Sequence, residues 1–185
     1  MLDEVVDPQN FGALLRSAFF LGHSSSIGVL VCAKNSSPAS PTVSAASAGA
    51  LELMTIHSTP NLPRALNSAV EDGWRVLGAA AEALTLGNAS EDGNGIIPCT
   101  DLMDLQLKKN EPTILVLGSE GHGLRNLVAR ACTEFVRIPS GAHMGLGTTN
   151  EDGGNQEGSV AGVDSLNVSV TGGILLWTLV KGVLK

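Results

Sequence analysis

The stretch LVLGSEGHGLRNLV, residues 115–128, joins an apolar run to a glycine-rich turn and then to a segment with helical spacing. A nearly continuous apolar run is typical of a strand that is buried on both faces, as in a parallel sheet. Open α/β sheets bind their ligands at the carboxyl ends of such strands. The turn is therefore a candidate binding site. Its Glu120 is either a functional carboxylate or a solvated acid near the next helix N-terminus, and its His122 fits a surface histidine.

Strand-like and helix-like segments alternate along the rest of the chain. Apolar runs predict strands at 2–6, 27–33, 53–57, 74–80, 113–119 and 134–139, and amphipathic spacing predicts helices at 10–22, 61–72, 123–133 and 165–184. Residues 85–98 resemble a surface loop, and we expect residues 140–163 to be a flexible insertion. The sequence thus predicts one α/β domain, residues 1–185, with a largely parallel sheet and helices on both faces.

The composition limits the class of protein. The 185 residues are 43% hydrophobic, which suffices for the core of a single domain. A net charge of −7 and a pI near 4.9 disfavour nucleic-acid binding by bulk charge. No apolar run approaches the roughly 20 residues of a membrane span. The opening MLDEVVDPQN also lacks the basic start and apolar core of a signal peptide, so we expect no membrane association.

The usual nucleotide, hydrolase and metal fingerprints are missing. The glycines of GSEGHG, residues 118–123, are spaced GxxGxG rather than GxGxxG, and no GxxxxGK[ST], GxSxG or HExxH motif occurs. The three cysteines, Cys32, Cys99 and Cys132, form no CxxC pair. We therefore expect reduced thiols and no structural metal.

The segment DPQNFGALLRS, residues 7–17, carries a charge inside an apolar helix. Five apolar residues repeat at the spacing of one buried stripe: Phe11, Leu14, Leu15, Ala18 and Phe19. Arg16 lies just beside that stripe, and Gly12 stands one turn earlier, so we expect open space beside the guanidinium. Arg16 is either a ligand-binding residue or a snorkelling arginine whose head meets water or a carboxylate.

A third unusual segment, DSLNVSVTGGILLWTLV, covers residues 164–180. Ser165, Asn167 and Ser169 precede the apolar body of the last predicted helix. Either Ser165 or Asn167 is expected to cap the helix by accepting hydrogen bonds from its free amides. The others remain candidates for a functional site.

Together these segments supply three motifs: Asn-x-Gly with an arginine six residues after the asparagine, LGxEGxGL, and IP followed later by SLNVSV. In order and spacing they resemble motifs 1, 2 and 3 of the SpoU/TrmH family of SPOUT RNA ribose 2′-O-methyltransferases. The resemblance runs from Leu2 to the C-terminus. Residues 35–54, NSSPASPTVSAASAGALELM, are similar to the branch that methylates a guanosine ribose in mitochondrial large-subunit ribosomal RNA.

This resemblance implies a fold, a reaction and partners. The fold is a SPOUT-type parallel α/β sheet whose C-terminal segment forms a trefoil knot, an exception to the rule that chains do not knot. The reaction transfers a methyl group from S-adenosylmethionine to a ribose 2′-hydroxyl of RNA, leaving S-adenosylhomocysteine, without a metal. The implied partners are RNA, with rRNA favoured over tRNA, and a second copy of the chain in a homodimer. The implied location is mitochondrial.

The site residues are carried over from the motifs. The implied catalytic positions are Arg16, Asn10, Glu120, Ser165 and Asn167. The implied cofactor-binding positions, which act largely through backbone groups, are Leu117, Gly118, Gly121, Ile138, Pro139 and Leu166. Glycines suit such a pocket because the backbone approaches the ligand without a Cβ. Since the pKa of a free arginine exceeds about 12, Arg16 is expected chiefly to position phosphate and hydroxyl, with some help in proton removal.

Two features depart from the family pattern. The segment 140–163 is long where the family has only a few residues, and the chain begins at the first motif, whereas family members usually carry an RNA-binding part before it. We therefore expect a catalytic domain that lacks its upstream RNA-binding part. The alternatives are a non-catalytic SPOUT-fold module that binds RNA or assists ribosome assembly, and a tRNA 2′-O-methyltransferase.

Overall fold

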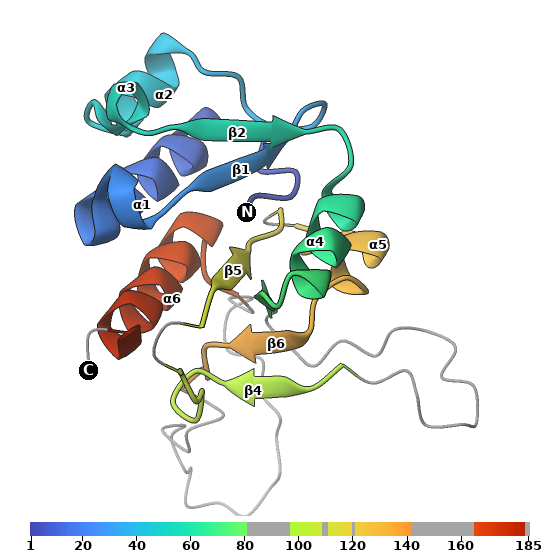
Figure 1. Ribbon diagram of the computed structural model, residues 1–185. Helices are drawn as coiled ribbons and strands as arrows, with labels where there is room; N and C mark the ends of the chain where they lie inside the picture. The colour runs from blue at the N-terminus through green and yellow to red at the C-terminus, as the bar shows by residue number, and fades with distance from the viewer. Residues whose placement is uncertain (81–96, 109–110, 120, 142–164, 184–185) are drawn as a thin grey trace, which may run out of the picture.

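The computed structural model describes residues 1–80, 97–108, 111–119, 121–141 and 165–183. Parallel strands alternate with helices along these residues (Figure 1). The first half contains α1 (Pro8–Ser26), β1 (Val29–Cys32), α2 (Pro41–Ala46), α3 (Ala50–Leu53), β2 (Ile56–Thr59), α4 (Leu62–Glu71) and β3 (Arg75–Ala79). The second half contains β4 (Cys99–Asp101), β5 (Thr113–Val116), α5 (Asn126–Ala129), β6 (Glu134–Arg137) and α6 (Val168–Val183).

The strands form two parallel sheets that a single residue joins. One sheet pairs β1 with β2, and the other has the order β4-β6-β3-β5. Leu2 makes parallel bridges to both Val31 and Leu117, and its N–H donates to Leu30 O at 2.9 Å. The strands therefore follow one another in the order β2-β1-Leu2-β5-β3-β6-β4, with all their carboxyl ends at one edge.

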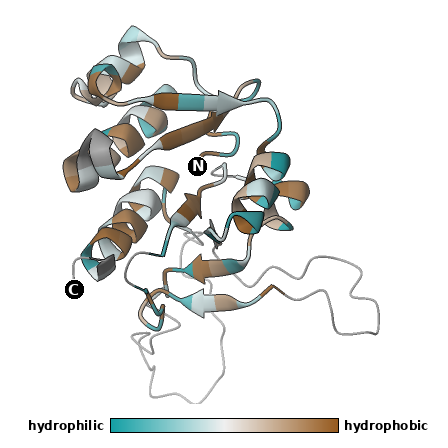
Figure 2. Ribbon diagram, viewed as in Figure 1, coloured by the Kyte–Doolittle hydropathy of each residue, from teal (hydrophilic) through white to brown (hydrophobic). Residues whose placement is uncertain are grey.

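Helices cover both faces of this sheet, and each face has its own core (Figure 1). On one face α1 packs against α6, α2 and α3, over buried residues such as Leu15 and Leu175. On the other face α4 and α5 pack over β3 and β6, with Leu66, Val128 and Phe135 fully buried. Figure 2 shows the apolar residues along β1 and β5, as expected for strands that are covered on both sides. The predicted α/β class is confirmed.

Two predicted elements are shorter than expected. Residues 2–6 do not form a strand beyond the bridge at Leu2, because Glu4 has a φ of 58° and turns the chain out of the extended conformation. The helix expected at 123–133 is only Asn126–Ala129. Gly123, with a φ of 64°, belongs to the preceding turn instead.

Three short elements, α2, α3 and β4, were not predicted. The start of α2 follows a familiar rule, since the Ser40 side chain accepts a hydrogen bond from the Val43 N–H and Pro41 follows the cap. This helix overturns the expectation of open space beside Gly12. A Cβ on Gly12 would lie 2.5 Å from Ala46 Cβ and 2.9 Å from Val43 O, so α2 fills that space and the glycine allows close helix packing.

The two irregular segments lie largely outside the described residues. Only 97–98 of the expected loop 85–98, and 140–141 of the expected insertion 140–163, are described. The expected trefoil knot depends on the path through this second segment. Among the residues that the structure describes, no helix is long and apolar enough to cross a membrane.

Candidate functional site

The glycine-rich turn after β5 is tightly closed on itself. Ser119 and Gly123 exchange two backbone hydrogen bonds, of 3.1 and 3.0 Å. A Cβ on Gly118 would lie 2.3 Å from the backbone C and O of Gly123, and Gly123 itself has a positive φ. Gly118 and Gly123 are therefore required by the geometry of the turn, whether or not a ligand is present.

Gly121 differs from the other two glycines of this turn. An added Cβ there would meet no atom within 4 Å, and the residue is exposed. Among these three glycines, only Gly121 is not explained by the geometry of the turn, so close approach of a ligand can account for the glycine there. His122 is exposed, as expected, and Glu120 lies outside the described residues.

Leu117 supports the turn from inside the core. It is 3% exposed, and a Cβ on Gly172 of α6 would lie 2.8 Å from its side chain. Its N–H donates to Met1 O and its carbonyl accepts from the Asp3 N–H. Both of its backbone groups and its side chain are therefore engaged within the protein.

The first and third motifs meet through two asparagines. Asn167 Nδ2 donates to Asn10 Oδ1 at 3.1 Å, which joins positions 157 residues apart. Asn167 Oδ1 also accepts from the N–H of Ser169 at 2.9 Å and from its hydroxyl at 2.6 Å. Asn167 therefore caps α6, which confirms the expectation of one capping residue, and the same side chain reaches Asn10.

Asn10 is itself held by the start of α1. Its N–H donates to Asp7 Oδ2 at 2.8 Å, and the Phe11 N–H donates to Asp7 O at 3.0 Å. Asp7 caps the helix, and Pro8 follows at a position that needs no donor. The sequence DPQN thus fixes where α1 begins and where Asn10 stands on it.

Arg16 is exposed on α1, four residues before Phe20, which is 82% exposed. No hydrogen bond or ion pair joins its guanidinium to any other residue that the structure describes. The snorkelling interpretation allowed the Arg16 guanidinium to pair with a carboxylate, and no such carboxylate is found among the residues that the structure describes. The guanidinium is available to a ligand or to solvent.

The remaining predicted residues lie around the same edge of the sheet. Ile138 and Pro139 are half-buried just after β6, two strands away from β5 across β3. Ser165 and Leu166 are exposed just before α6. The structure joins Asn10 to Asn167 by a hydrogen bond, while Gly118, Ile138 and Leu166 lie next to three different elements, β5, β6 and α6.

An ion pair beside the turn was missed by the sequence reasoning. Asp3 is fully buried and accepts hydrogen bonds from Arg125, which follows the turn. This hydrogen bond raises the pKa of the Arg125 guanidinium, despite some burial. Two features of the sequence could have drawn attention to this pair: Asp3 is an acidic residue among apolar ones at the start of the chain, and Arg125 directly follows LGSEGHGL. Nothing in the local sequence pattern indicates that the two residues contact each other.

The three cysteines are free thiols with different surroundings. Burial raises the pKa of the Cys132 thiol to about 12, with a further contribution from Asp3. Burial also opposes ionisation of Cys32, but backbone hydrogen bonds from Lys34 and Asn35 and the nearby Arg125 guanidinium lower the pKa of its thiol. Among the described residues no group of His, Cys, Asp and Glu could hold a metal ion.

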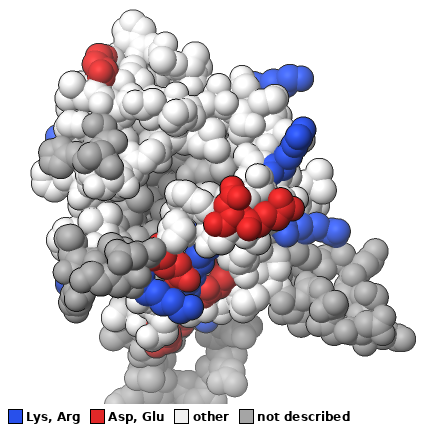
Figure 3. Space-filling model, in the orientation of Figure 1, with Lys and Arg blue, Asp and Glu red and all other residues white. Residues whose placement is uncertain are grey.

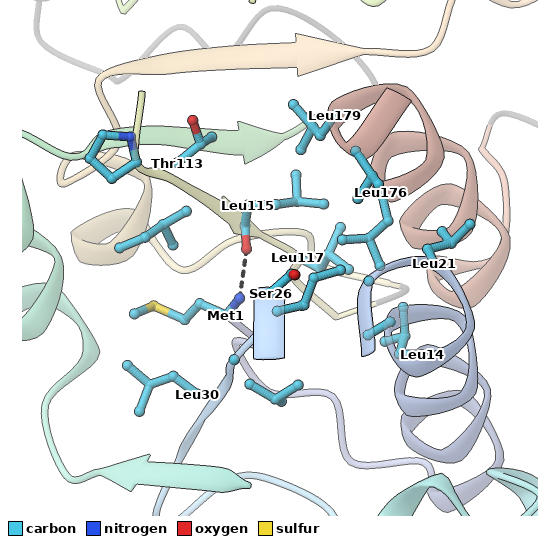
Figure 4. A pocket seen from close by; sticks show the side chains of 18 of the residues that line it. Met1, Leu14, Leu21, Ser26, Leu30, Thr113, Leu115, Leu117, Leu176 and Leu179 are labelled. Carbon is cyan, nitrogen blue, oxygen red and sulfur yellow. Dashed lines mark hydrogen bonds between the residues drawn. The ribbon is translucent and has the colours of Figure 1, made fainter. Parts of the chain in front are cut away.

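An apolar cavity lies on another part of the sheet. It has a volume of about 800 Å³ and opens between α1, α6 and the facing edges of β1 and β5, where only Leu2 bridges the strands (Figure 4). Its walls are mainly apolar, with Leu14, Leu176 and Leu179 among the side chains that line it. Leu117 is the one predicted cofactor residue on its wall. The cavity and the glycine turn are thus separate features.

Comparison with known proteins identifies the family. The SpoU rRNA Methylase family matches residues 1–144. This chain belongs to the SpoU rRNA methylase family. The match covers the first two motifs, together with β5 and α5 on either side of the glycine turn, so the family assignment includes the region of the turn.

Curated relatives share the whole chain but are longer. The chain is 38% identical to rRNA methyltransferase 1, mitochondrial, of Dictyostelium discoideum, over 98% of this chain and 28% of that protein. It is 36% identical to the human protein of the same name, over 97% of this chain and 44% of that one. A 23S rRNA (guanosine-2′-O-)-methyltransferase of Burkholderia is 36% identical over 100% of this chain and 59% of its own length. The chain therefore spans between a quarter and three fifths of these relatives.

Solved structures of the family have the same fold. A TrmH-family protein from Porphyromonas gingivalis superposes with a TM-score of 0.70 at 29% identity, covering 96% of this chain and 57% of that chain. An rRNA methyltransferase from Sinorhizobium meliloti, solved with S-adenosylmethionine bound, gives 0.70 at 23% identity, covering 100% and 56%. At that identity the second likeness concerns the fold alone.

Proposed function

We propose that this protein transfers a methyl group from S-adenosylmethionine to a ribose 2′-hydroxyl of RNA, and that the target is a guanosine in mitochondrial large-subunit rRNA. The hydrogen bond between Asn10 and Asn167 carries the proposal, because it unites the first and third motifs at the carboxyl edge of the sheet. The relatives named as mitochondrial and guanosine-2′-O rRNA methyltransferases support the substrate and the location.

The proposed cofactor pocket lies along the glycine turn, with Gly118, Gly121, Ile138, Pro139 and Leu166 around it. The open space at Gly121 supports this assignment, since a ligand can approach the backbone there. Leu117, whose groups are engaged in the sheet and core, would hold the pocket from below. We further propose that the segment before α6 closes the pocket as a trefoil knot. When bound, S-adenosylmethionine supplies an electrophilic methyl group on a sulfonium.

Arg16 is the proposed catalytic residue. Its exposed guanidinium, without a partner among the described residues, can hold a backbone phosphate of the RNA and the target hydroxyl together. It would also assist removal of the hydroxyl proton as the oxygen attacks the methyl group. Asn10, Asn167, Ser165 and Glu120 would orient Arg16 and the ribose.

The proposed active form is a homodimer that pairs through α1 and α6. Four apolar residues form one exposed stripe at helical spacing on and just before α6: Leu166, Val170, Ile174 and Trp177. Phe20 is exposed on α1, which packs against α6. A second copy would cover this apolar surface, which is large for an isolated chain.

The proposed RNA contacts are local. The chain has a net charge of −7, and on the face shown in Figure 3 the basic side chains are separated from one another, while acidic ones gather near the middle of the view. Because phosphate binding by bulk charge is disfavoured, the RNA would be held at a few positions such as Arg16.

Calorimetric titration with S-adenosylmethionine and single-turnover methylation of large-subunit rRNA test the proposal. We expect saturable cofactor binding and a ribose methyl group at one mapped guanosine. Cofactor binding without transfer to rRNA or tRNA would favour the non-catalytic module, and transfer to tRNA alone would correct the substrate. Absence of cofactor binding would contradict the proposed function.

A further inference from the structure

One buried residue holds both ends of the glycine turn. The Asp3 N–H donates to Leu117 O at 2.8 Å, where the chain enters the turn. The Asp3 carboxylate accepts from the main-chain N–H of Arg125 at 3.0 Å and from its Nε at 2.8 Å, where the chain leaves the turn. Arg125 Nη2 also lies 2.6 Å from Asp3 Oδ1. The base of the turn is thus closed by a residue from another part of the sequence.

The pair is built as a rigid contact. The Asp3 side chain is 0% exposed, so its carboxylate depends on Arg125 for the hydrogen bonds that water would otherwise make. The Arg125 guanidinium donates to Asp3 Oδ1, while the Arg125 backbone N–H donates to Asp3 Oδ2. Glu4 Oε1 lies 3.6 Å from Arg125 Nη1 and adds a second acid on the outer side. Little freedom is left to Arg125, and hence to the turn before it.

The same residue also leads to the first motif. Asp3 lies four residues before Asp7, whose carboxylate caps α1 at Asn10. Asp3 is therefore joined to the glycine turn by hydrogen bonds and to the residue that caps α1 by a short stretch of chain.

We propose that Asp3, acting through Arg125, is a positioning residue that holds the glycine turn in the conformation that binds S-adenosylmethionine. This inference rests on the proposed function. Neither side chain needs to touch the cofactor, because a turn fixed at both ends loses less conformational entropy when a ligand binds its backbone. Weakening the pair should therefore weaken cofactor binding while leaving the chemical step at saturating cofactor largely unchanged.

The decisive variant is Asp3→Asn, which keeps the shape of the side chain but replaces one acceptor oxygen with a donor. We expect the Kd and the KM for S-adenosylmethionine to rise about tenfold, with kcat at saturating cofactor within about twofold of the wild type. Arg125→Lys keeps the charge and the main-chain N–H but loses the fork, so we expect a smaller rise of about threefold. This milder variant tests the proposal if Asp3→Asn does not fold.

The matched control is Glu134→Gln. Glu134 Oε2 pairs with Arg75 Nη2 at 2.6 Å and with Nε at 3.2 Å, at the amino ends of β6 and β3, away from the glycine turn. We expect this variant to lose stability without any change in the Kd for the cofactor. A merely structural role for Asp3 predicts the same behaviour for both variants.

Calorimetric titration and initial-rate kinetics on the purified protein distinguish the outcomes. Wild-type affinity in folded Asp3→Asn, or in Arg125→Lys where Asp3→Asn does not fold, overturns the positioning role. So does an equal loss of affinity in Glu134→Gln. If the wild type itself binds no S-adenosylmethionine, the proposed function fails, and the positioning role fails with it.

Discussion

The two ends of β5 have opposite surroundings. Its carboxyl end runs into a closed polar turn, which is pinned by the buried pair of Asp3 and Arg125. Its amino end leads to the apolar cavity of about 800 Å³ between α1 and α6, whose wall continues along the strand to Leu117. The Asn10–Asn167 contact between the first and third motifs does not lie on this cavity, although apolar pockets are the usual first candidates for binding sites. We therefore base the proposed site on the polar groups at the carboxyl edge rather than on cavity volume.

The largest effect should come from Arg16, on the side of the molecule where the motifs meet. Because a lysine ammonium cannot reproduce the planar fork, both Arg16→Lys and Arg16→Ala should lower single-turnover methyl transfer by about 10² or more. Folding and cofactor binding should stay near the wild type, since no described residue depends on this guanidinium. Near-normal methyl transfer by Arg16→Lys would instead support the interpretation of Arg16 as a snorkelling surface residue.

Next in size is the effect of obstructing the turn. Gly121→Val should fold normally, since no atom lies within 4 Å of an added Cβ, but should weaken cofactor binding by at least about tenfold by blocking the ligand. The neighbouring change His122→Ala should alter the Kd by less than about twofold. Titration calorimetry of both variants checks this contrast. Equal losses would argue against a backbone-lined pocket here.

A smaller effect is expected where the first and third motifs touch. Asn10→Ala removes the acceptor of the 3.1 Å hydrogen bond from Asn167, a contact worth about 1 kcal/mol. Transfer should fall several-fold, with little loss of thermal stability. As a control, Asn61→Ala removes the cap of α4 on the other face, at a cost of about 1 kcal/mol in unfolding free energy, and should leave transfer unchanged. Similar transfer rates for the two variants would contradict the role of the asparagine contact.

The smallest effect on the site should come from the apolar cavity, on its α6 wall. Leu179 lines the apolar cavity, and Leu179→Ala should lower the unfolding free energy by about 2 kcal/mol through lost packing. Cofactor affinity should remain within about twofold of the wild type, as measured by denaturant unfolding and calorimetry on one preparation. A strong loss of cofactor affinity would link the cavity to the proposed cofactor site, and would contradict the separation of the cavity from the glycine turn.

Much of the fold follows from local patterns. The apolar runs at 27–33, 74–80, 113–119 and 134–139 all contain strands, because continuous burial leaves the same trace in every parallel strand. Helix α1 was anticipated from its apolar stripe and α4 from its amphipathic spacing. The edge strand β4 was not, since its three residues, Cys99–Asp101, are only half-buried and carry no apolar run.

The site was anticipated less completely, for a physical reason. A motif shows which residue types occur together, and the asparagines at 10 and 167 could be selected in this way. The role of Gly12 was misjudged because its neighbours, Val43 and Ala46, lie on a helix some 30 residues away in sequence. Asp3 was overlooked because its partner is separated from it by 122 positions.

The amino-acid sequence alone was sufficient for the α/β class, the presence of a cap before the last helix and the family, since each depends on the spacing of residue types along a short segment. Only the folded chain decided that Asn167 reaches Asn10, that α2 closes the space beside Gly12, and that Asp3 holds both ends of the glycine turn. These contacts join distant segments. Their geometry follows from how helices and strands pack, which no local pattern encodes.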